Sequence, residues 1–104
     1  MMDVLIRGEG IEIGEELENF IKKKVRKIER KLPELPSMEV HIFSESTRSG
    51  VIKRVEMVIE LGGLELRGEA EGKEILSVIE EASKHLSRQV EKFKGKLRER
   101  RRES

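Results

Sequence analysis

Cysteine, tyrosine and tryptophan are absent from this chain of 104 residues, and each absence narrows the possible functions. Without cysteine there can be neither a disulfide framework nor a thiolate metal site, which favours a reducing compartment. The three phenylalanines offer few platforms on which nucleic-acid bases could stack. No apolar run approaches the roughly 20 residues that a membrane-spanning helix needs, and no signal peptide is recognisable. We therefore expect a soluble, cytoplasmic protein with no membrane partner.

Patterns typical of catalysis or cofactor binding are also missing. The two histidines, His41 and His85, show no metal-ligand spacing such as a pair at i,i+4. Gly8, Gly10 and Gly14 follow an expected strand, but they do not form G-x-G-x-x-G and no P-loop lysine follows them. The glutamates are expected to be exposed and paired with bases, so no general acid and base can be singled out. The sequence predicts no enzyme, no metal site, no cofactor and no small-molecule substrate.

Charge is abundant but unevenly distributed along the chain. Charged residues make up 41% of the sequence, yet the formal net charge is only +1. Residues 22–31 hold seven bases and one acid, and residues 84–104 hold nine bases and three acids. The positive charge is therefore concentrated in two segments, and the rest of the chain is acidic on balance.

Hydrophobic periodicity predicts six elements in the order β-α-β-β-β-α. Apolar residues spaced three and four apart predict helices at residues 15–31 and from 73 to about 101. Alternating apolar and polar residues predict four strands, at residues 3–9, 38–43, 54–61 and 64–71.

The segments between these elements carry turn signals. Pro33 and Pro36 are expected to end the first helix and form a turn. The polar residues 44–50 are expected to form a loop. Gly62 and Gly63 predict a two-residue hairpin turn, because both central residues of such a turn need positive φ.

Chain direction then predicts how the elements are arranged. A right-handed crossover places the second strand parallel to the first, and two hairpins reverse the third and fourth strands in turn. Both helices therefore run in the same direction and pack on one face of a four-stranded mixed sheet. This α+β fold brings the basic halves of the helices to the same end of a single domain, residues 1–104, with a basic tail at about 98–104.

At about 100° per residue, basic side chains line one shoulder of the apolar stripe of each helix. Two such rows on adjacent parallel helices are expected to form a positively charged groove that contacts phosphate groups. Phe43, on the outer side of its strand, is the only candidate for base stacking, and a packing role is favoured for it. The predicted rows are Lys24, Lys27 and Lys31 on the first helix and His85, Arg88, Lys92 and Lys96 on the second.

The alternative is a pair of solvated helix faces with internal ion pairs. Glu80 with Lys84, and Glu81 with His85, have the i,i+4 spacing that such pairs require. We favour the groove because the acids that would neutralise the basic halves lie elsewhere in the sequence.

Four segments carry a likeness to a known family: IEIGEEL at 11–17, KVRKIER at 24–30, GG at 62–63 and LSRQVEK at 86–92. Together they resemble the ribosome hibernation promoting factor family, also called the ribosome-associated inhibitor A or sigma-54 modulation protein family, in its short form. The likeness covers about residues 2–98. It implies a β-α-β-β-β-α domain that binds the small ribosomal subunit in the channel for mRNA and tRNA, contacts ribosomal RNA, and inhibits translation during stress or stationary phase.

The same likeness implies positions for the contacts with ribosomal RNA. They fall on Lys24, Lys27, Arg30, Arg88, Lys92 and Lys96, whereas His85 stands where a lysine is common. Two other functions are kept as alternatives. A general double-stranded RNA-binding domain also sets helices on one face of a small antiparallel sheet, and the acidic sheet face could serve a protein-interaction module.

Overall fold

The structure is a computed structural model that describes residues 3–32 and 37–103, with side chains described up to residue 97. The predicted turn at Pro33 and Pro36 and the side chains of the predicted basic tail at 98–104 lie outside the described residues. The six predicted elements are confirmed in their predicted order, as β1 (Asp3–Glu9), α1 (Glu15–Lys31), β2 (Ser37–Thr47), β3 (Gly50–Leu61), β4 (Leu64–Gly72) and α2 (Ile75–Glu103).

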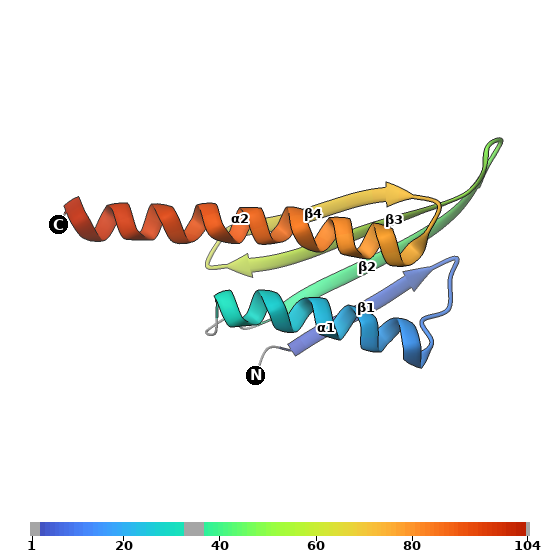
Figure 1. The fold of residues 1–104 in the computed structure, drawn as a ribbon, viewed down its shortest axis with the longest axis horizontal. Coiled ribbons are helices and arrows are strands. Elements are labelled where there is room, and N and C mark those ends of the chain that lie inside the picture. Colours follow the sequence, from blue (N-terminus) through green and yellow to red (C-terminus); the bar gives the residue numbers. More distant parts are fainter. Residues whose placement is uncertain (1–2, 33–36, 104) are drawn as a thin grey trace.

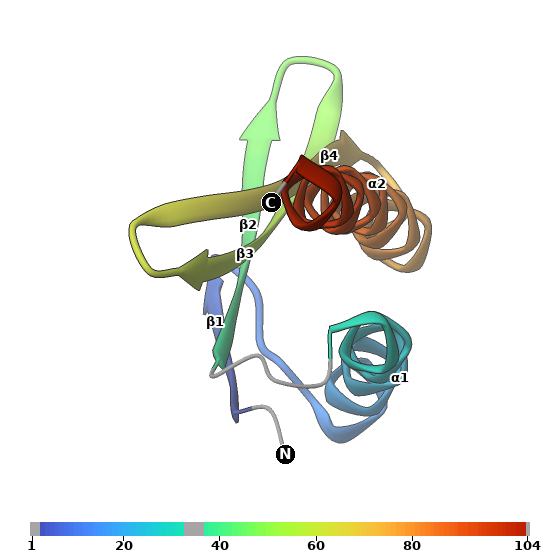
Figure 2. The ribbon, with the colours of Figure 1, turned by 90° about the vertical axis from the view of Figure 1, so that its left-hand side faces the viewer.

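The four strands form one mixed sheet in the order β1-β2-β3-β4. β1 pairs with β2 in parallel, and the other two pairings are antiparallel, as the chain direction predicted. Both helices run in the same direction along one face of the sheet (Figure 1). An end-on view shows them side by side, with the other face of the sheet left open (Figure 2). The predicted α+β architecture is therefore confirmed.

The hairpin between β2 and β3 is tighter than the sequence predicted. The loop expected at residues 44–50 is wrong, because both strands continue until Thr47 pairs with Gly50. The Thr47 hydroxyl donates to the carbonyl of Gly50 at 2.7 Å and accepts from the amide of Ser49 at 3.2 Å. Polar residues can extend a strand pair here because these contacts, rather than burial, hold the end of the hairpin.

One hydrophobic core fills the space between the sheet and the helices. Inward-facing residues of β2, β3 and β4 meet three residues of α1 and five of α2. The α2 stripe predicted from periodicity is buried from Ile79 to Val90, but Leu97 is 39% exposed. The C-terminal part of α2 extends past the sheet, where no strand is available to pack against it (Figure 1).

Gly68 of β4 sets how closely α2 approaches the sheet. A Cβ atom on Gly68 would lie 2.2 Å from the carbonyl oxygen of Ala82 and 2.5 Å from the amide nitrogen of Leu86. Real Cβ atoms do not approach backbone atoms so closely, so only glycine permits this contact. The contact fixes which side of α2 faces the sheet, and therefore which side faces α1.

Candidate nucleic-acid interface

The three predicted basic residues on one side of α1 all reach the space between the helices. Lys24, Lys27 and Lys31 line a hollow of about 320 Å³ together with residues of α2. Seven residues separate Lys24 from Lys31, which is close to two helical turns, so both project from the same side of α1. This half of the predicted groove therefore has the expected orientation.

The α2 wall of this hollow differs from the predicted row. Its members are Glu80, Ser83, Lys84, Ser87 and Arg88, so only Arg88 belongs to the row predicted from the sequence. The small serine side chains leave the hollow open between the helices. The Ser83 hydroxyl donates to the backbone carbonyl of Glu80 at 2.7 Å, so its hydrogen bond is made within α2.

Two glutamates of α2 form ion pairs with the lysines of α1. Glu80 Oε1 lies 3.5 Å from Lys24 Nζ, and Glu91 Oε1 lies 3.5 Å from Lys31 Nζ. The pairs expected within α2, Glu80 with Lys84 and Glu81 with His85, are not among the ion pairs of the described residues. Periodicity alone could not identify Glu80 and Glu91 as partners of α1, because their partners lie 56 and 60 positions away in the sequence.

Lys24 is the most enclosed of these lysines. Its side chain is only 15% exposed, and its ammonium lies 5.2 Å from the centroid of the Phe20 ring, within the range of a cation–π contact. The position of Lys24 is thus fixed by a neighbour on its own helix as well as by Glu80.

His85 does not face α1, and this corrects the predicted row. Its Nδ1 atom lies 2.6 Å from the backbone oxygen of Glu69, so the ring is held against the edge strand β4. His85 is therefore on the shoulder of α2 that points away from the groove. The reason is the Gly68 contact, which turns Leu86 toward the sheet and leaves Ser83 and Ser87 toward α1.

The remaining predicted residues extend the basic surface around α2. A second, shallower hollow of about 530 Å³ crosses the outer surface of α2 and is lined by Lys31, His85, Arg88 and Lys92, among others. Arg88 lines both hollows and lies between them. Lys96 is exposed one turn beyond Lys92, and Arg30 is exposed in the last turn of α1. We call the surface formed by these eight predicted residues the basic helical face.

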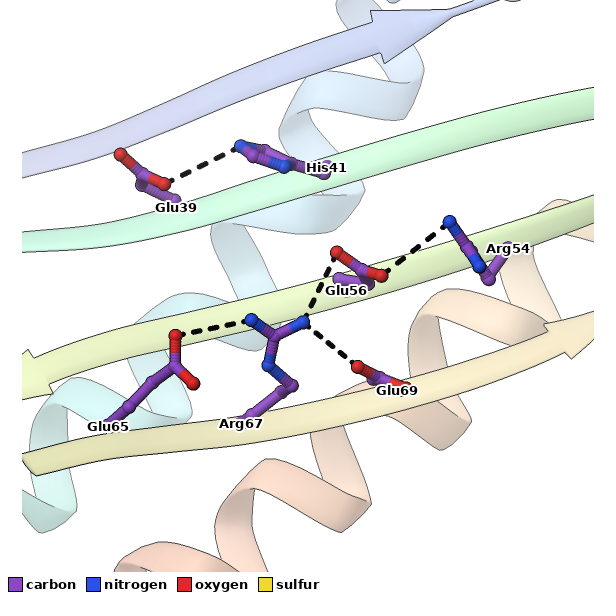
Figure 3. Close-up of polar contacts among 7 residues, drawn as sticks. All are labelled: Glu39, His41, Arg54, Glu56, Glu65, Arg67 and Glu69. Carbon is purple, nitrogen blue, oxygen red and sulfur yellow. Dashed lines mark hydrogen bonds and ion pairs between the residues drawn. The ribbon is translucent and has the colours of Figure 1, made fainter.

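The open face of the sheet has the opposite character. On this face Arg67 of β4 contacts three carboxylates, with distances of 3.4 Å to Glu56, 3.2 Å to Glu65 and 3.0 Å to Glu69 (Figure 3). Hydrogen bonds from Arg67 to Glu65 and Glu69 raise the pKa of this guanidinium above its ordinary value. Around this network, the outward strand positions hold many further acids and few bases, so the basic helical face and the acidic sheet face lie on opposite sides of the domain.

Phe43 lies on this acidic face in a packed arrangement. Arg54 sits over its ring at 4.6 Å, and His41 meets it edge-on with 6.3 Å between ring centroids. His41 also lies 3.5 Å from a carboxylate oxygen of Glu39 (Figure 3). The ring is therefore engaged by its neighbours, which fits the packing role favoured from the sequence.

The described part of the chain also bears on metal binding and membrane insertion. No group of three or more His, Asp or Glu side chains is placed there to hold a metal ion. Neither of the described helices is both long and apolar enough to cross a membrane.

Comparison with known protein sequences points to one family. Residues 4–98 match the profile of the family described as sigma 54 modulation protein / S30EA ribosomal protein. A ribosome hibernation promotion factor from Staphylococcus aureus (strain COL) is 28% identical over 92 residues, which cover 88% of this chain and 48% of that protein. The chain thus spans about half the length of this curated relative.

Solved structures share the fold at low sequence identity. A ribosomal subunit interface protein from Coxiella burnetii superposes with a TM-score of 0.79 and 20% identity, covering 90% of this chain and 99% of that one. The N-terminal domain of Protein Y from Thermus thermophilus gives a TM-score of 0.70 and 22% identity, covering 89% of this chain and 99% of that one.

Proposed function

The chain belongs to the sigma 54 modulation protein / S30EA ribosomal protein family, and from this membership we propose that it is a cytoplasmic hibernation factor without enzymatic activity. In this proposal it binds the small ribosomal subunit at the channel for mRNA and tRNA and inhibits translation. The basic helical face contacts ribosomal RNA, through Lys24, Lys27, Arg30, Lys31, His85, Arg88, Lys92 and Lys96.

The observation that carries this proposal is the joining of two distant basic segments on one face. Lys24, Lys27 and Lys31 of α1 and Arg88 of α2 line the same hollow. Ammonium and guanidinium groups placed together on a rigid scaffold can contact several phosphates at once, and such contacts dominate the affinity of nucleic-acid-binding proteins. Aromatic residues are scarce, so the surface is suited to recognising the backbone and shape of folded RNA rather than its bases.

In this proposal, translation is inhibited because the domain occupies the channel for mRNA and tRNA. A domain about 54 Å long and 27 by 21 Å across that is bound in the channel would exclude mRNA and tRNA sterically, and no bond needs to be made or broken. The wall of acids on the open sheet face would repel further RNA, so the domain would bind by one side.

Sedimentation with purified small subunits tests the proposal directly. The wild-type protein is expected to pellet with the subunits, to be displaced by tRNA together with mRNA, and to inhibit translation in a reconstituted system. Changing Lys24, Lys27, Arg88 and Lys92 to Glu together is expected to abolish pelleting, because four cations that face phosphates become anions.

A variant with the same change in net charge is the matched control. Arg7, Arg48, Lys53 and Lys73 lie outside the basic helical face, and changing all four to Glu should leave most of the binding intact. Equal loss of binding in both variants would mean that total charge, not this face, decides the interaction. Equally tight binding to a plain RNA duplex, without competition by tRNA and mRNA, would favour the general double-stranded RNA-binding domain instead.

A further inference from the structure

Glu80 and Glu91 occupy an unexpected place in a surface that contacts phosphate. They lie eleven residues apart, close to three helical turns, so both project from the side of α2 that faces α1. Each carboxylate pairs with a lysine of the groove, Glu80 with Lys24 and Glu91 with Lys31. The two pairs flank the serines that line the hollow, so a carboxylate stands toward each end of the groove.

These pairs are of the kind that a phosphate can replace. Glu80 and Glu91 are about half exposed, and both pairs are 3.5 Å long. The Glu91–Lys31 pair is exposed on both sides, and such pairs contribute little to stability. In the Glu80–Lys24 pair the lysine is only 15% exposed, but the carboxylate is open to solvent. A phosphate oxygen would compete for the same ammonium groups, and it would be repelled by the carboxylates already there.

We propose that Glu80 and Glu91 are built-in competitors for the phosphate-binding lysines, and that they lower the affinity of the groove for RNA. The inference rests on the proposed function of the basic helical face. In the free protein the two glutamates neutralise Lys24 and Lys31, whereas Lys27 takes part in no ion pair among the described residues. RNA then makes its first contact near the middle of the groove and must displace a carboxylate to gain each further lysine.

Glu80 and Glu91 are expected to differ in how much each lowers the affinity for RNA. Lys24 is held against the Phe20 ring, so it keeps its place when Glu80 is removed and is at once available to a phosphate. Lys31 is 38% exposed near the end of α1, so removing Glu91 frees a side chain that must still be ordered on binding. Removing Glu80 should therefore raise affinity more than removing Glu91.

The test replaces glutamate by glutamine, and each variant in the groove has a control of the same net charge on the sheet face. Glu80→Gln is expected to tighten binding to small subunits about two- to fivefold, and Glu91→Gln about twofold, the range that corresponds to exposed ion pairs. The double variant should combine both gains. Glu60→Gln and the double change Glu60→Gln with Glu71→Gln remove the same charges from the sheet face, and they should alter affinity less than 1.5-fold, since exposed charges beyond about 8 Å are largely screened at physiological salt.

A second measurement does not depend on ribosomes. On immobilised heparin, a polyanion, Glu80→Gln should elute at higher salt than Glu60→Gln. Lys24→Gln should also weaken retention more when made in the Glu80→Gln protein than in the wild type, because only there is Lys24 unneutralised.

The outcomes separate this inference from the proposed function. Equal behaviour of Glu80→Gln and Glu60→Gln in both assays overturns the inference, even if the wild type pellets with small subunits. If the wild type does not bind small subunits but Glu80→Gln still elutes from heparin at higher salt than Glu60→Gln, the ribosomal function is refuted. The inference that the glutamates compete with phosphate then still holds.

Discussion

Replacing Gly68 by alanine should loosen the attachment of α2 to the sheet. The added methyl group would lie 2.2 Å from Ala82 O, 2.5 Å from Leu86 N and 2.8 Å from Leu86 Cβ. Two of these three atoms are backbone, so no rotamer change can relieve the clash. The helix must instead move outward by more than about 1 Å to restore ordinary contact distances of roughly 3.5 Å.

Gly68→Ala is expected to lower the free energy of unfolding by a large amount for a single added methyl group. Overpacking a core typically costs about 1–3 kcal/mol, and the backbone clash places this substitution at the upper end, about 3 kcal/mol. For a domain of about this size each kcal/mol lowers Tm by about 4–8 °C, so Gly68→Ala should melt about 12–24 °C below the wild type. Urea denaturation followed by circular dichroism gives the free energy, and a thermal scan gives Tm.

Gly95→Ala is the matched control for this prediction. Gly95 lies in α2, the helix that Gly68 contacts, but a Cβ atom on Gly95 would meet nothing within 4 Å. Alanine is favoured over glycine by about 1 kcal/mol in a helix interior, so this variant should be stabilised slightly. A Gly68→Ala protein within about 0.5 kcal/mol of the wild type, the range of ordinary surface substitutions, would refute the account of how α2 is seated.

The same substitution has a functional consequence. Because α2 carries one wall of the groove, its displacement would move Ser87 and Arg88 away from the lysines of α1. Well below its melting temperature, folded Gly68→Ala should therefore bind small subunits more weakly than Gly95→Ala. A variant that is destabilised but binds normally would show that the spacing of the helices is not important for recognition.

Two other predictions concern the two charged faces. Lys27→Gln should reduce the slope of log affinity for small subunits against log salt concentration by about 1, the value for one phosphate contact, and an unchanged slope would remove Lys27 from the interface. Arg67→Gln should cost about 1 kcal/mol, since the exposed Arg67 then no longer offsets repulsion among Glu56, Glu65 and Glu69. Because the pKa of Arg67 is raised, its contribution is complete below the ordinary arginine pKa and is lost only as pH rises through the still higher folded value. The difference between the two proteins in urea denaturation should thus be the same at pH 6 and pH 9, and a marked change over that range would contradict this view of Arg67.

The fold was largely predictable because local signals and chain direction agree. The helical spacing of Ile21, Val25 and Ile28 and the Gly62-Gly63 turn each predict one structure, and both are observed. The end of the β2–β3 hairpin was not predictable from hydrophobicity, because residues 44–50 are mostly polar. There the pairing is continued by the Thr47 hydroxyl and by Gly50, whose φ is 117°.

The site was predictable only in part, for a geometric reason. An apolar stripe has two shoulders, and periodicity alone does not say which one faces a neighbouring helix. On α1 the shoulder of Lys24 and Lys31 is the correct one. On α2 only Arg88 of the predicted row lines the hollow between the helices, whereas His85 lies on the far shoulder and contacts the backbone of Glu69 on the edge strand β4. The rotation of α2 depends on Gly68, whose importance appears only when the strand and helix are placed together.

The separation of charge between the two faces bears on how the protein would approach RNA. Three arginines stand against nine acids at the outward positions of the strands, which are Asp3, Glu9, Glu39, Glu45, Glu56, Glu60, Glu65, Glu69 and Glu71. The helices carry most of the basic residues, so a net charge of +1 conceals a strong dipole across the thickness of the domain. In the field of a polyanion such a dipole turns its basic helical face forward before contact, which raises the rate of productive encounters. Neutralising the sheet acids would raise the net positive charge and yet weaken this orientation, so association with small subunits would become less selective for one face rather than simply faster.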